Sequence, residues 1–428
     1  MLRKLLVISL VILFGMVALV GCDPAEEVVD EPVDEPVDEP VDEPTEEPIV
    51  IGHLMAKTGV FGPYGIRTAL GSELAVEEIN EAGGILGRPV EIIYEDTEAN
   101  PSVAVDRSRR LVDEAGVKFV MGSASSSVSL ALAAEAMADE FIFVNVGGYT
   151  PELSSDDGGE FVFTALWNNL QLQRACAKMV SEEPWDTVYN MSPDYVFGHE
   201  AWEVFSTSMN ELYRPDNPIE VVGSDFPAFG TEDFSDYIAK IAAANPDVIY
   251  STLWATDEIT FLRQGLEFGL FDDVKHYISG AAVPDELALA LGPDGMQPFA
   301  DLGVTIWAMS IYDPSWPDTE KNQRFIDSFY DKFGDYPYAK TWADYAAVYL
   351  IKEGIEKAGS AEPADVAAAL SGITWENEQG TWQIREEDHM VIPEMIVGGI
   401  LQPGDFPVWS LGDIQLFPGE EVTPDPLR

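Results

Sequence analysis

PVEIIYEDTEANPSVAVDRSRRLVDEAGVKFVMGSASSSVSLALAAEAMADEFIFVNV, residues 89–146, decides the fold of this chain. Apolar and β-branched runs predict three strands, at 89–96, 117–122 and 141–146. Apolar residues with helical spacing predict a helix between each pair of strands, at 101–116 and 130–140. Strand–helix alternation of this kind implies a parallel sheet with helices on both faces.

The alternation continues on both sides of this stretch. Residues 49–56 predict a strand, and residues 71–84 predict a helix that stops at glycine. Later strand candidates, with helical segments between them, lie at 186–192, 219–226, 246–253 and 275–281. Because roughly 380 residues exceed what one hydrophobic core usually holds, we predict an α/β protein with two doubly wound parallel-sheet lobes. A cleft between the lobes, beyond the carboxyl ends of the strands, is the expected binding site.

The amino terminus has the pattern of an export signal. A basic start precedes an apolar run over residues 5–20, which is shorter than the roughly 18 residues of a membrane-spanning helix. The run ends in LVGC, which resembles a bacterial lipobox and predicts a signal peptide over 1–22 with lipidation of Cys22. The alternatives are an ordinary signal peptide or a membrane anchor with a chance cysteine.

A low-complexity acidic segment follows the signal. Residues 23–48 repeat Asp-Glu-Pro every four residues and contain 13 acidic and no basic side chains. Such a segment cannot bury enough apolar surface to fold, so we predict a disordered, extended stalk that lifts a folded domain off the membrane.

The net charge limits the classes of binding partner, and the cysteine count limits the disulfides that the chain can form. The chain has 76 acidic and 23 basic residues, a formal net charge of −53, which argues against nucleic acid and anionic membrane surfaces as partners. Cys176 is the only cysteine besides Cys22, so no intramolecular disulfide is expected in the mature chain. We predict that Cys176 is a small buried apolar residue.

The serine-rich stretch at 121–136 has three interpretations. It is too tightly flanked by strand and helix patterns for a flexible linker. It lacks the Gly-x-Ser-x-Gly of a nucleophile elbow, and no histidine is paired with it in the sequence, so no catalytic residue is assigned. A turn between strand and helix offers backbone N–H groups and hydroxyls to an anion such as a carboxylate. Plain helix capping without a ligand stays open.

Cofactor motifs are missing from the sequence. The glycines of the turn at 58–65 have the wrong spacing for a dinucleotide fingerprint, and no Walker sequence occurs. No histidine or cysteine cluster has the spacing of a metal site. We therefore expect no cofactor and no metal.

Nearly the whole of residues 49–428 resembles a known family. IGHLMAKTGVFGPYG, AVEEINEAGGILGRPVE, EDFSDYIAKIAAANPDVIY and FLRQGLEFGL are similar to segments of the periplasmic-type binding proteins of ABC importers, the leucine/isoleucine/valine-binding class. The resemblance implies a type I receptor, two lobes joined by a multi-strand hinge, that closes on a small molecule and delivers it to a membrane permease. We expect a monomer located outside the cytoplasm.

The resemblance also implies binding residues in the first lobe. Ser126, with Ser127 next, matches the serine whose hydroxyl binds the ligand's carboxylate. Tyr64 matches an aromatic residue of the first βα loop. Gly148 and Tyr149 match a loop that supplies a backbone group and usually a threonine, so the bulky Tyr149 is a departure from the pattern.

In the second lobe the resemblance implies an aromatic wall. Phe197, with Tyr195 two residues earlier, and Trp254 match aromatic positions of the family. The acid that receives the ammonium of an amino acid would align near Ala281, where no acid stands, and Asp257 could replace it only if its helix start faces the cleft. We therefore expect a small carboxylate or amide with an apolar or aromatic body, and an α-amino acid is in doubt.

The domain limits follow from the same resemblance. The first lobe is predicted over 49–167 plus about 312–376, and the second over 168–311 plus about 377–428. A ligand-sensing domain that works with a signalling partner is the alternative function. The sequence shows no spanning helix after the signal and no attached kinase or regulator domain, which favours transport. An envelope hydrolase, whose nucleophile elbow is missing, is a third reading.

Overall fold

The computed structural model describes residues 47–58, 62–123, 125–155, 158–403 and 409–427. For residues 63 and 64 it describes the backbone only. The predicted signal peptide, Cys22 and nearly all of the predicted stalk lie outside the described residues. No described helix is both long enough and apolar enough to cross a membrane.

The first lobe is built on a sheet of five parallel strands with the order β2-β1-β3-β4-β5. The strands are β1 (Ile49–Met55), β2 (Val90–Asp96), β3 (Phe119–Gly122), β4 (Ile142–Asn145) and β5 (Val162–Thr164). The first four correspond to the strands predicted from the sequence. The three-residue β5 is too short to have given a periodic signal.

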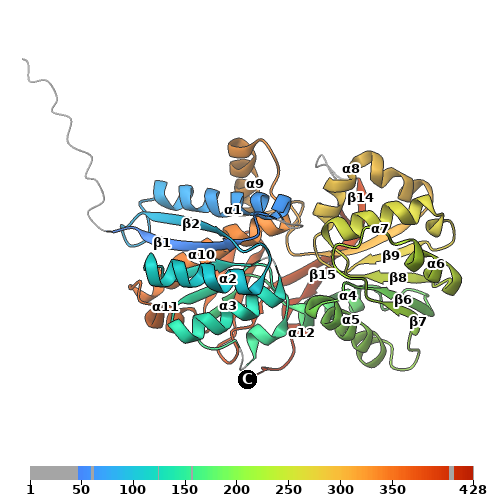
Figure 1. Cartoon of the computed structure of the whole chain (residues 1–428), viewed down its shortest axis with the longest axis horizontal. Coiled ribbons are helices and arrows are strands. Elements are labelled where there is room, and N and C mark those ends of the chain that lie inside the picture. The colour runs from blue at the N-terminus through green and yellow to red at the C-terminus, as the bar shows by residue number, and fades with distance from the viewer. Residues whose placement is uncertain (1–46, 59–61, 124, 156–157, 404–408, 428) are drawn as a thin grey trace, which may run out of the picture. The chain divides into compact units, whose positions relative to one another are not determined.

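Helices cover both faces of this sheet (Figure 1). They are α1 (Gly62–Glu81), α2 (Pro101–Arg109), α3 (Ser126–Asp139), α9 (Glu320–Phe333), α10 (Ala339–Ala358) and α11 (Pro363–Leu370). On one face, Ile51 of β1 shares a core with Leu74 of α1 and Trp342 of α10. On the other face, Leu54 of β1 packs in a core with Leu132 of α3. Side chains alternate along a strand, so β1 supplies both cores.

The second lobe contains a seven-stranded sheet with the order β15-β14-β10-β9-β8-β6-β7. The strands are β6 (Thr187–Met191), β7 (Glu220–Asp225), β8 (Val248–Ser251), β9 (His276–Ser279), β10 (Thr305–Ser310), β14 (Met395–Pro403) and β15 (Trp409–Pro418). The first five strands are parallel. At the edge formed by β10, β14 pairs antiparallel with β10, and β15 pairs antiparallel with β14. The predicted parallel sheet is confirmed for the first five strands, and the carboxyl-terminal chain adds a hairpin at its edge that the strand pattern did not predict.

Helices also sandwich the second sheet (Figure 1). They are α4 (Asn169–Val180), α5 (Val196–Thr207), α6 (Ser235–Ala244), α7 (Ala255–Glu267) and α8 (Pro284–Asp301), the last interrupted by non-helical backbone at Gly292. Cys176 of α4 is fully buried in the core beneath that helix, as predicted. The two-lobed α/β fold predicted from the sequence is confirmed.

The chain crosses between the lobes at residues 165–168 and 311–319, between β5 and α4 and between β10 and α9. A small sheet of β11 (Thr374–Asn377), β12 (Gly380–Ile384) and β13 (Val391–Ile392) precedes β14. Trp382 of β12 contacts Trp342 of the first lobe, with ring centroids 5.2 Å apart. The predicted boundary near 377 did not anticipate this contact, and the exact lobe limits stay predictions.

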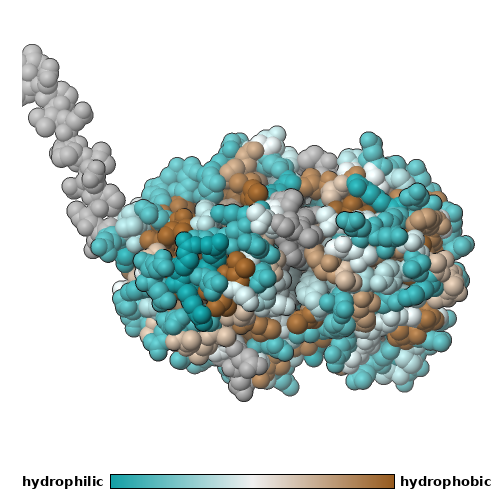
Figure 2. Space-filling view, in the orientation of Figure 1, coloured by the Kyte–Doolittle hydropathy of each residue, from teal (hydrophilic) through white to brown (hydrophobic). Residues whose placement is uncertain are grey.

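Short elements complete the described chain. They are α12 (Gly419–Val422) and the turns of helix η2 (Arg110–Glu114), η3 (Pro151–Ser154), η4 (Ser208–Tyr213) and η5 (Leu270–Asp272). The visible face of the described residues is mainly hydrophilic, with apolar patches scattered over it (Figure 2).

Candidate functional site

The serine stretch forms the turn between β3 and α3. Ser125 has extended backbone angles and caps the helix, its Oγ accepting a hydrogen bond from the backbone N–H of Val128 at 3.4 Å. Helix α3 then begins at Ser126. Since the first turn of a helix has N–H groups without an intrahelical acceptor, this end of α3 is suited to an anion.

A second polar loop, after β4, packs against the serine turn. The Oγ of buried Ser126 accepts a hydrogen bond from the backbone N–H of Tyr149 at 3.2 Å. Asn145 holds the loop in place, because its side chain both accepts from the N–H of Gly148 and donates to the Gly148 carbonyl, each at 2.8 Å. The loop and the start of α3 are therefore one connected unit.

The second lobe presents aromatic rings from the turns after β6 and β8. The indole N–H of Trp254 donates to the phenol oxygen of Tyr195 at 2.8 Å. The Tyr195 ring lies 5.9 Å from that of Phe197, and Phe197 lies 5.6 Å from Tyr149 of the first lobe. These rings connect the two lobes across the cleft.

A cavity, which we call the aromatic cavity, lies between these two sets of residues. The first lobe lines it with Ser125, Ser126 and Tyr149, and the second lobe lines it with Tyr195, Phe197 and Trp254. Gly147, Ala281, Val283 and Lys340 complete the lining. The cavity thus combines a helix start that is suited to an anion with an apolar, aromatic wall.

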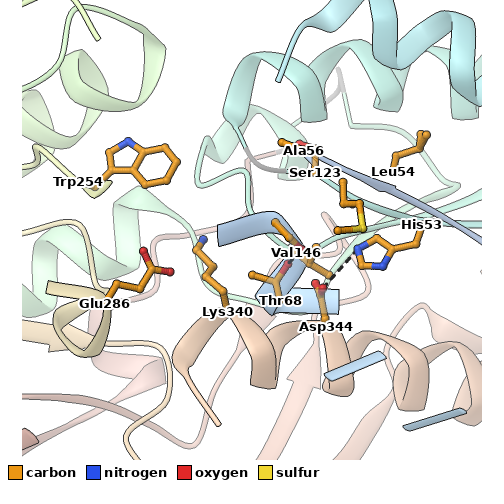
Figure 3. Close-up of a pocket in the computed structure, with 13 residues that line it drawn as sticks. His53, Leu54, Ala56, Thr68, Ser123, Val146, Trp254, Glu286, Lys340 and Asp344 are labelled. Carbon is orange, nitrogen blue, oxygen red and sulfur yellow. Dashed lines mark hydrogen bonds and ion pairs between the residues drawn. The ribbon is translucent and has the colours of Figure 1, made fainter. Parts of the chain in front are cut away.

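A second cavity, which we call the charged cavity, is lined by Lys340, Glu286, Asp344 and Thr68 among others (Figure 3). Trp254 and Lys340 line both cavities. Lys340 lies in the first turn of α10, and its ammonium donates to the phenol oxygen of Tyr149 at 3.2 Å. The same ammonium lies 4.4 Å from the Tyr149 ring centroid, within the range of a cation–π contact.

Burial shifts the proton affinity of the groups around the charged cavity. It raises the pKa of the Asp344 carboxyl to about 7 and lowers the pKa of His53 to about 3. Burial also raises the pKa of Glu286, to which Asp285 adds by repulsion, and lowers the pKa of Lys340, which Glu286 partly restores. A buried carboxyl resists ionisation because it loses hydration.

A Ser–His–Asp arrangement also touches the charged cavity. Ser72 Oγ lies 3.4 Å from His53 Nδ1, and His53 Nε2 lies 3.3 Å from the Asp344 carboxylate. Ser72 is fully buried and donates to the carbonyl of Ala69 at 2.8 Å, so its hydroxyl does not face the cavity as a nucleophile. Among the described residues no group of three or more histidine, cysteine or acidic side chains could hold a metal ion.

Five of the residues proposed from the sequence line the aromatic cavity together: Ser126, Tyr149, Tyr195, Phe197 and Trp254. Ser127 and Gly148 are neighbours of the lining, and both backbone groups of Gly148 already bond to Asn145. Gly147 lines the cavity instead. The side chain of Tyr64 lies outside the described residues.

The structure does not bring Asp257 to this site. Its carboxylate is buried and accepts the backbone N–H of Gly230 at 2.9 Å, and it lines neither cavity. Asp257 was considered as a replacement acid only if the start of its helix faces the cleft. Its carboxylate instead bonds to the 228–231 loop, and its role in binding stays a prediction.

Sequence reasoning missed Lys340 and Glu286. Lys340 lies in the first turn of α10, which has no predicted strand directly before it, whereas Glu286 lies in the first turn of α8, which follows the predicted strand at 275–281. Glu286 stands five positions after Ala281, the place at which an acid was sought and not found. A charged side chain within the first turn of a helix was the available signal.

Comparisons with known proteins identify the family of the chain. The profile of a family described as "Periplasmic binding protein" matches residues 48–403. The Leu/Ile/Val-binding protein homolog 1 of Brucella abortus is 28% identical over 327 residues, which cover 75% of this chain and 82% of that protein. A leucine-, isoleucine-, valine-, threonine- and alanine-binding protein of Pseudomonas aeruginosa is 28% identical over 324 residues, 76% of this chain and 82% of that protein.

Solved structures share the fold. The amino acid ABC transporter substrate-binding protein of Pseudomonas fluorescens Pf-5 is 25% identical with a TM-score of 0.75, covering 89% of this chain and 97% of that one. A solute binding protein of an ABC transporter from Rhodopseudomonas palustris BisB5, in complex with 3,4-dihydroxybenzoic acid, is 18% identical with a TM-score of 0.76. That match covers 87% of this chain and 97% of the other.

Proposed function

We propose, from the premise that the chain belongs to the periplasmic binding protein family, that it is the extracytoplasmic solute receptor of an ABC importer. The resemblance to the leucine/isoleucine/valine-binding class is confirmed by the family match and by the relatives of that name. The family consists of substrate-binding receptors and is not a class of enzymes. The receptor would bind a small molecule and deliver it to permease subunits in the membrane.

The single observation that carries the proposal is the composition of the aromatic cavity. Its walls come from both lobes, so a bound molecule would contact the start of α3 on one side and the ring of Trp254 on the other. A ligand that bridges two lobes favours their closed arrangement, because it binds that arrangement more tightly than an open one.

The cavity favours a small carboxylate or amide with an apolar or aromatic body. The helix start and the serine hydroxyls suit an acidic or acceptor group, and the rings of Tyr149, Phe197 and Trp254 suit a flat or apolar body. The fold is able to hold such ligands, since the related Rhodopseudomonas palustris protein holds a dihydroxybenzoic acid. Branched-chain amino acids, which the named relatives bind, belong in the same screen.

Three further parts of the proposal rest on the sequence. Lipidation of Cys22 would tether the protein to the cell membrane, and the acidic segment after it would act as a stalk. The receptor is proposed to work as a monomer and without catalysis of its own. Its net charge of −53 disfavours nucleic acid as a partner.

A thermal-shift screen tests the proposed function. The panel contains branched-chain and aromatic amino acids, aromatic acids, their amides and short carboxylates. A ligand at one hundred times its dissociation constant stabilises a receptor by about 2.7 kcal/mol, which raises the melting temperature measurably. The proposal predicts that at least one of these compounds raises the melting temperature. That compound should be recovered chemically unchanged after incubation with the protein, because the receptor does not consume it. A panel without any shift would contradict the receptor function.

A further inference from the structure

Lys340 differs from the other polar residues of the cleft in charge and in position. It is the one cation among the described residues that line the two cavities, and it stands where the cavities meet. No described carboxylate lies within 4.0 Å of its ammonium, although Glu286 and Asp344 line the same cavity. Figure 3 shows its nitrogen directed toward the space between Trp254 and Glu286. A cation in such a place is available to a ligand.

Tyr149 links Lys340 to the serine turn. The backbone N–H of Tyr149 bonds to Ser126 Oγ at 3.2 Å, while its phenol oxygen accepts from Lys340 Nζ at 3.2 Å. Ser126 and Lys340 are therefore hydrogen-bonded to the two ends of one tyrosine residue. A benzene ring with acidic groups at opposite positions offers one group toward each end in the same way.

We infer that Lys340 is a specificity-determining residue that binds a second acidic group of the ligand, so that the receptor prefers dicarboxylates whose acidic groups are one benzene ring apart. The inference deepens the proposed function and rests on it. One carboxylate would lie at the start of α3, the ring would lie against Trp254, and the other carboxylate would accept from Lys340. Charge-assisted hydrogen bonds of this kind are about twice as strong as neutral ones.

Glu286 is the competitor for the same ammonium. It comes from α8 of the second lobe, and its Oε2 has no hydrogen-bond partner among the described residues. If the carboxylate of Glu286 moved onto Lys340, the cation would be satisfied internally and would not discriminate between ligands. The experiment below distinguishes a Lys340 that binds the ligand from a Lys340 that pairs with Glu286.

The test is equilibrium binding by calorimetry with two probes of matched shape, benzene-1,4-dicarboxylate and 4-methylbenzoate. The methyl group replaces one carboxylate, so the pair isolates the second acidic group. We expect the unaltered protein to bind the dicarboxylate at least 10-fold more tightly. Lys340→Met should weaken dicarboxylate binding by about 10- to 100-fold and change 4-methylbenzoate binding less than about 3-fold.

Two variants control for folding and for general charge. Lys340→Arg keeps the cation and should keep most of the preference for the dicarboxylate. Lys352→Met removes a cation from the same helix that pairs with Glu356 outside both cavities, and it should behave like the unaltered protein. Thermal melts without ligand show whether each variant folds, and the 4-methylbenzoate affinity shows whether its cleft is intact.

Other outcomes separate the inference from the proposed function. Equal affinity for the two probes, or an equal loss of both in Lys340→Met, would overturn the role of Lys340. Binding of other compounds in the thermal-shift panel without binding of the dicarboxylate would also overturn it, while the receptor function would stand. A protein that binds nothing in either experiment would fail both.

Discussion

The two lobes contribute different chemistry to one cleft. The first lobe supplies polar groups, namely the start of α3, the hydroxyl of Ser126 and the ammonium of Lys340. The second lobe supplies mainly rings, those of Tyr195, Phe197 and Trp254. The polar groups are fixed by hydrogen bonds within their own lobe, whereas the rings form a surface that tolerates different apolar shapes. Under the proposed function, the first lobe would orient a ligand and the second lobe would enclose it.

The largest expected effect comes from removing the ring that lines both cavities. Trp254→Ala should weaken binding of any ligand found in the screen by about 2–3 kcal/mol, roughly 30- to 150-fold, because buried tryptophans carry much of the energy of an interface. Calorimetry measures the change. Phe268→Ala, at the exposed far end of α7, is the control and should leave affinity unaltered. Equal affinity in both variants would mean that Trp254 is not a wall of the site.

The second lobe also contains a buried acidic residue, which makes the stability of the protein depend on pH. Glu258 of α7 is buried and accepts from the Tyr277 hydroxyl at 3.0 Å, and burial raises its pKa to about 7. The native state therefore holds this proton more tightly than the unfolded state, and stability falls as the pH rises from about 4.5 to 7.

Glu258→Gln removes that dependence. The variant should be more stable than the unaltered protein at pH 8 by on the order of 1–3 kcal/mol, and the difference should shrink toward pH 5. Denaturant unfolding at several pH values measures it. Glu267→Gln, on the exposed side of the same helix, should leave the pH dependence unchanged. A Glu258→Gln variant with the same pH slope as the unaltered protein would argue that this carboxyl is not the responsible group.

A smaller effect is expected in the first lobe. Ser126→Ala removes the hydroxyl that accepts the Tyr149 N–H, which should weaken binding of a carboxylate by about 10-fold, roughly 1.4 kcal/mol. Ser127→Ala is the matched variant one residue later, where the side chain does not line the cavity, and a change of less than about 3-fold is expected. The reverse order of these two effects would mean that Ser127 is the ligand-binding hydroxyl.

The smallest effect is expected at Asp257. Its carboxylate accepts the Gly230 N–H and lines neither cavity, so Asp257→Asn should change affinity less than about 2-fold for acids and amino acids alike. Calorimetry with a carboxylate and with the matching α-amino acid checks this. A selective loss of amino acid binding would restore Asp257 as the acceptor of an ammonium.

The sequence predicted the fold well where the chain alternates regularly. Strands β1 to β4 and β6 to β9 have apolar, β-branched runs bounded by turn residues, and these signals are local. The hairpin of β14 and β15 was missed because its position at the edge of the sheet depends on β10, almost ninety residues earlier in the chain.

The site, like the fold, was predicted where the signal is local in the sequence and was missed where it depends on the packing of distant segments. Ser126, Tyr149 and Trp254 follow strands directly, so the rule that cleft loops lie at the carboxyl ends of strands located them. Lys340 reaches the cleft from the start of α10, which is brought there only by the packing of that helix, whereas Glu286 follows a predicted strand but stands five positions beyond Ala281, where the resemblance placed the acid. Asp257 was considered as a replacement acid on the condition that the start of its helix faces the cleft, and whether such a side chain does so depends on the helix turn that holds it.

The most direct test of the account is a crystal structure of the protein with the tightest ligand from the thermal-shift screen. The account predicts that the acidic or acceptor group of that ligand lies within hydrogen-bonding distance of the start of α3, at Ser126, and that its body contacts the ring of Trp254. A ligand bound to one lobe alone, or at a place away from both cavities, would contradict the division of roles between the lobes.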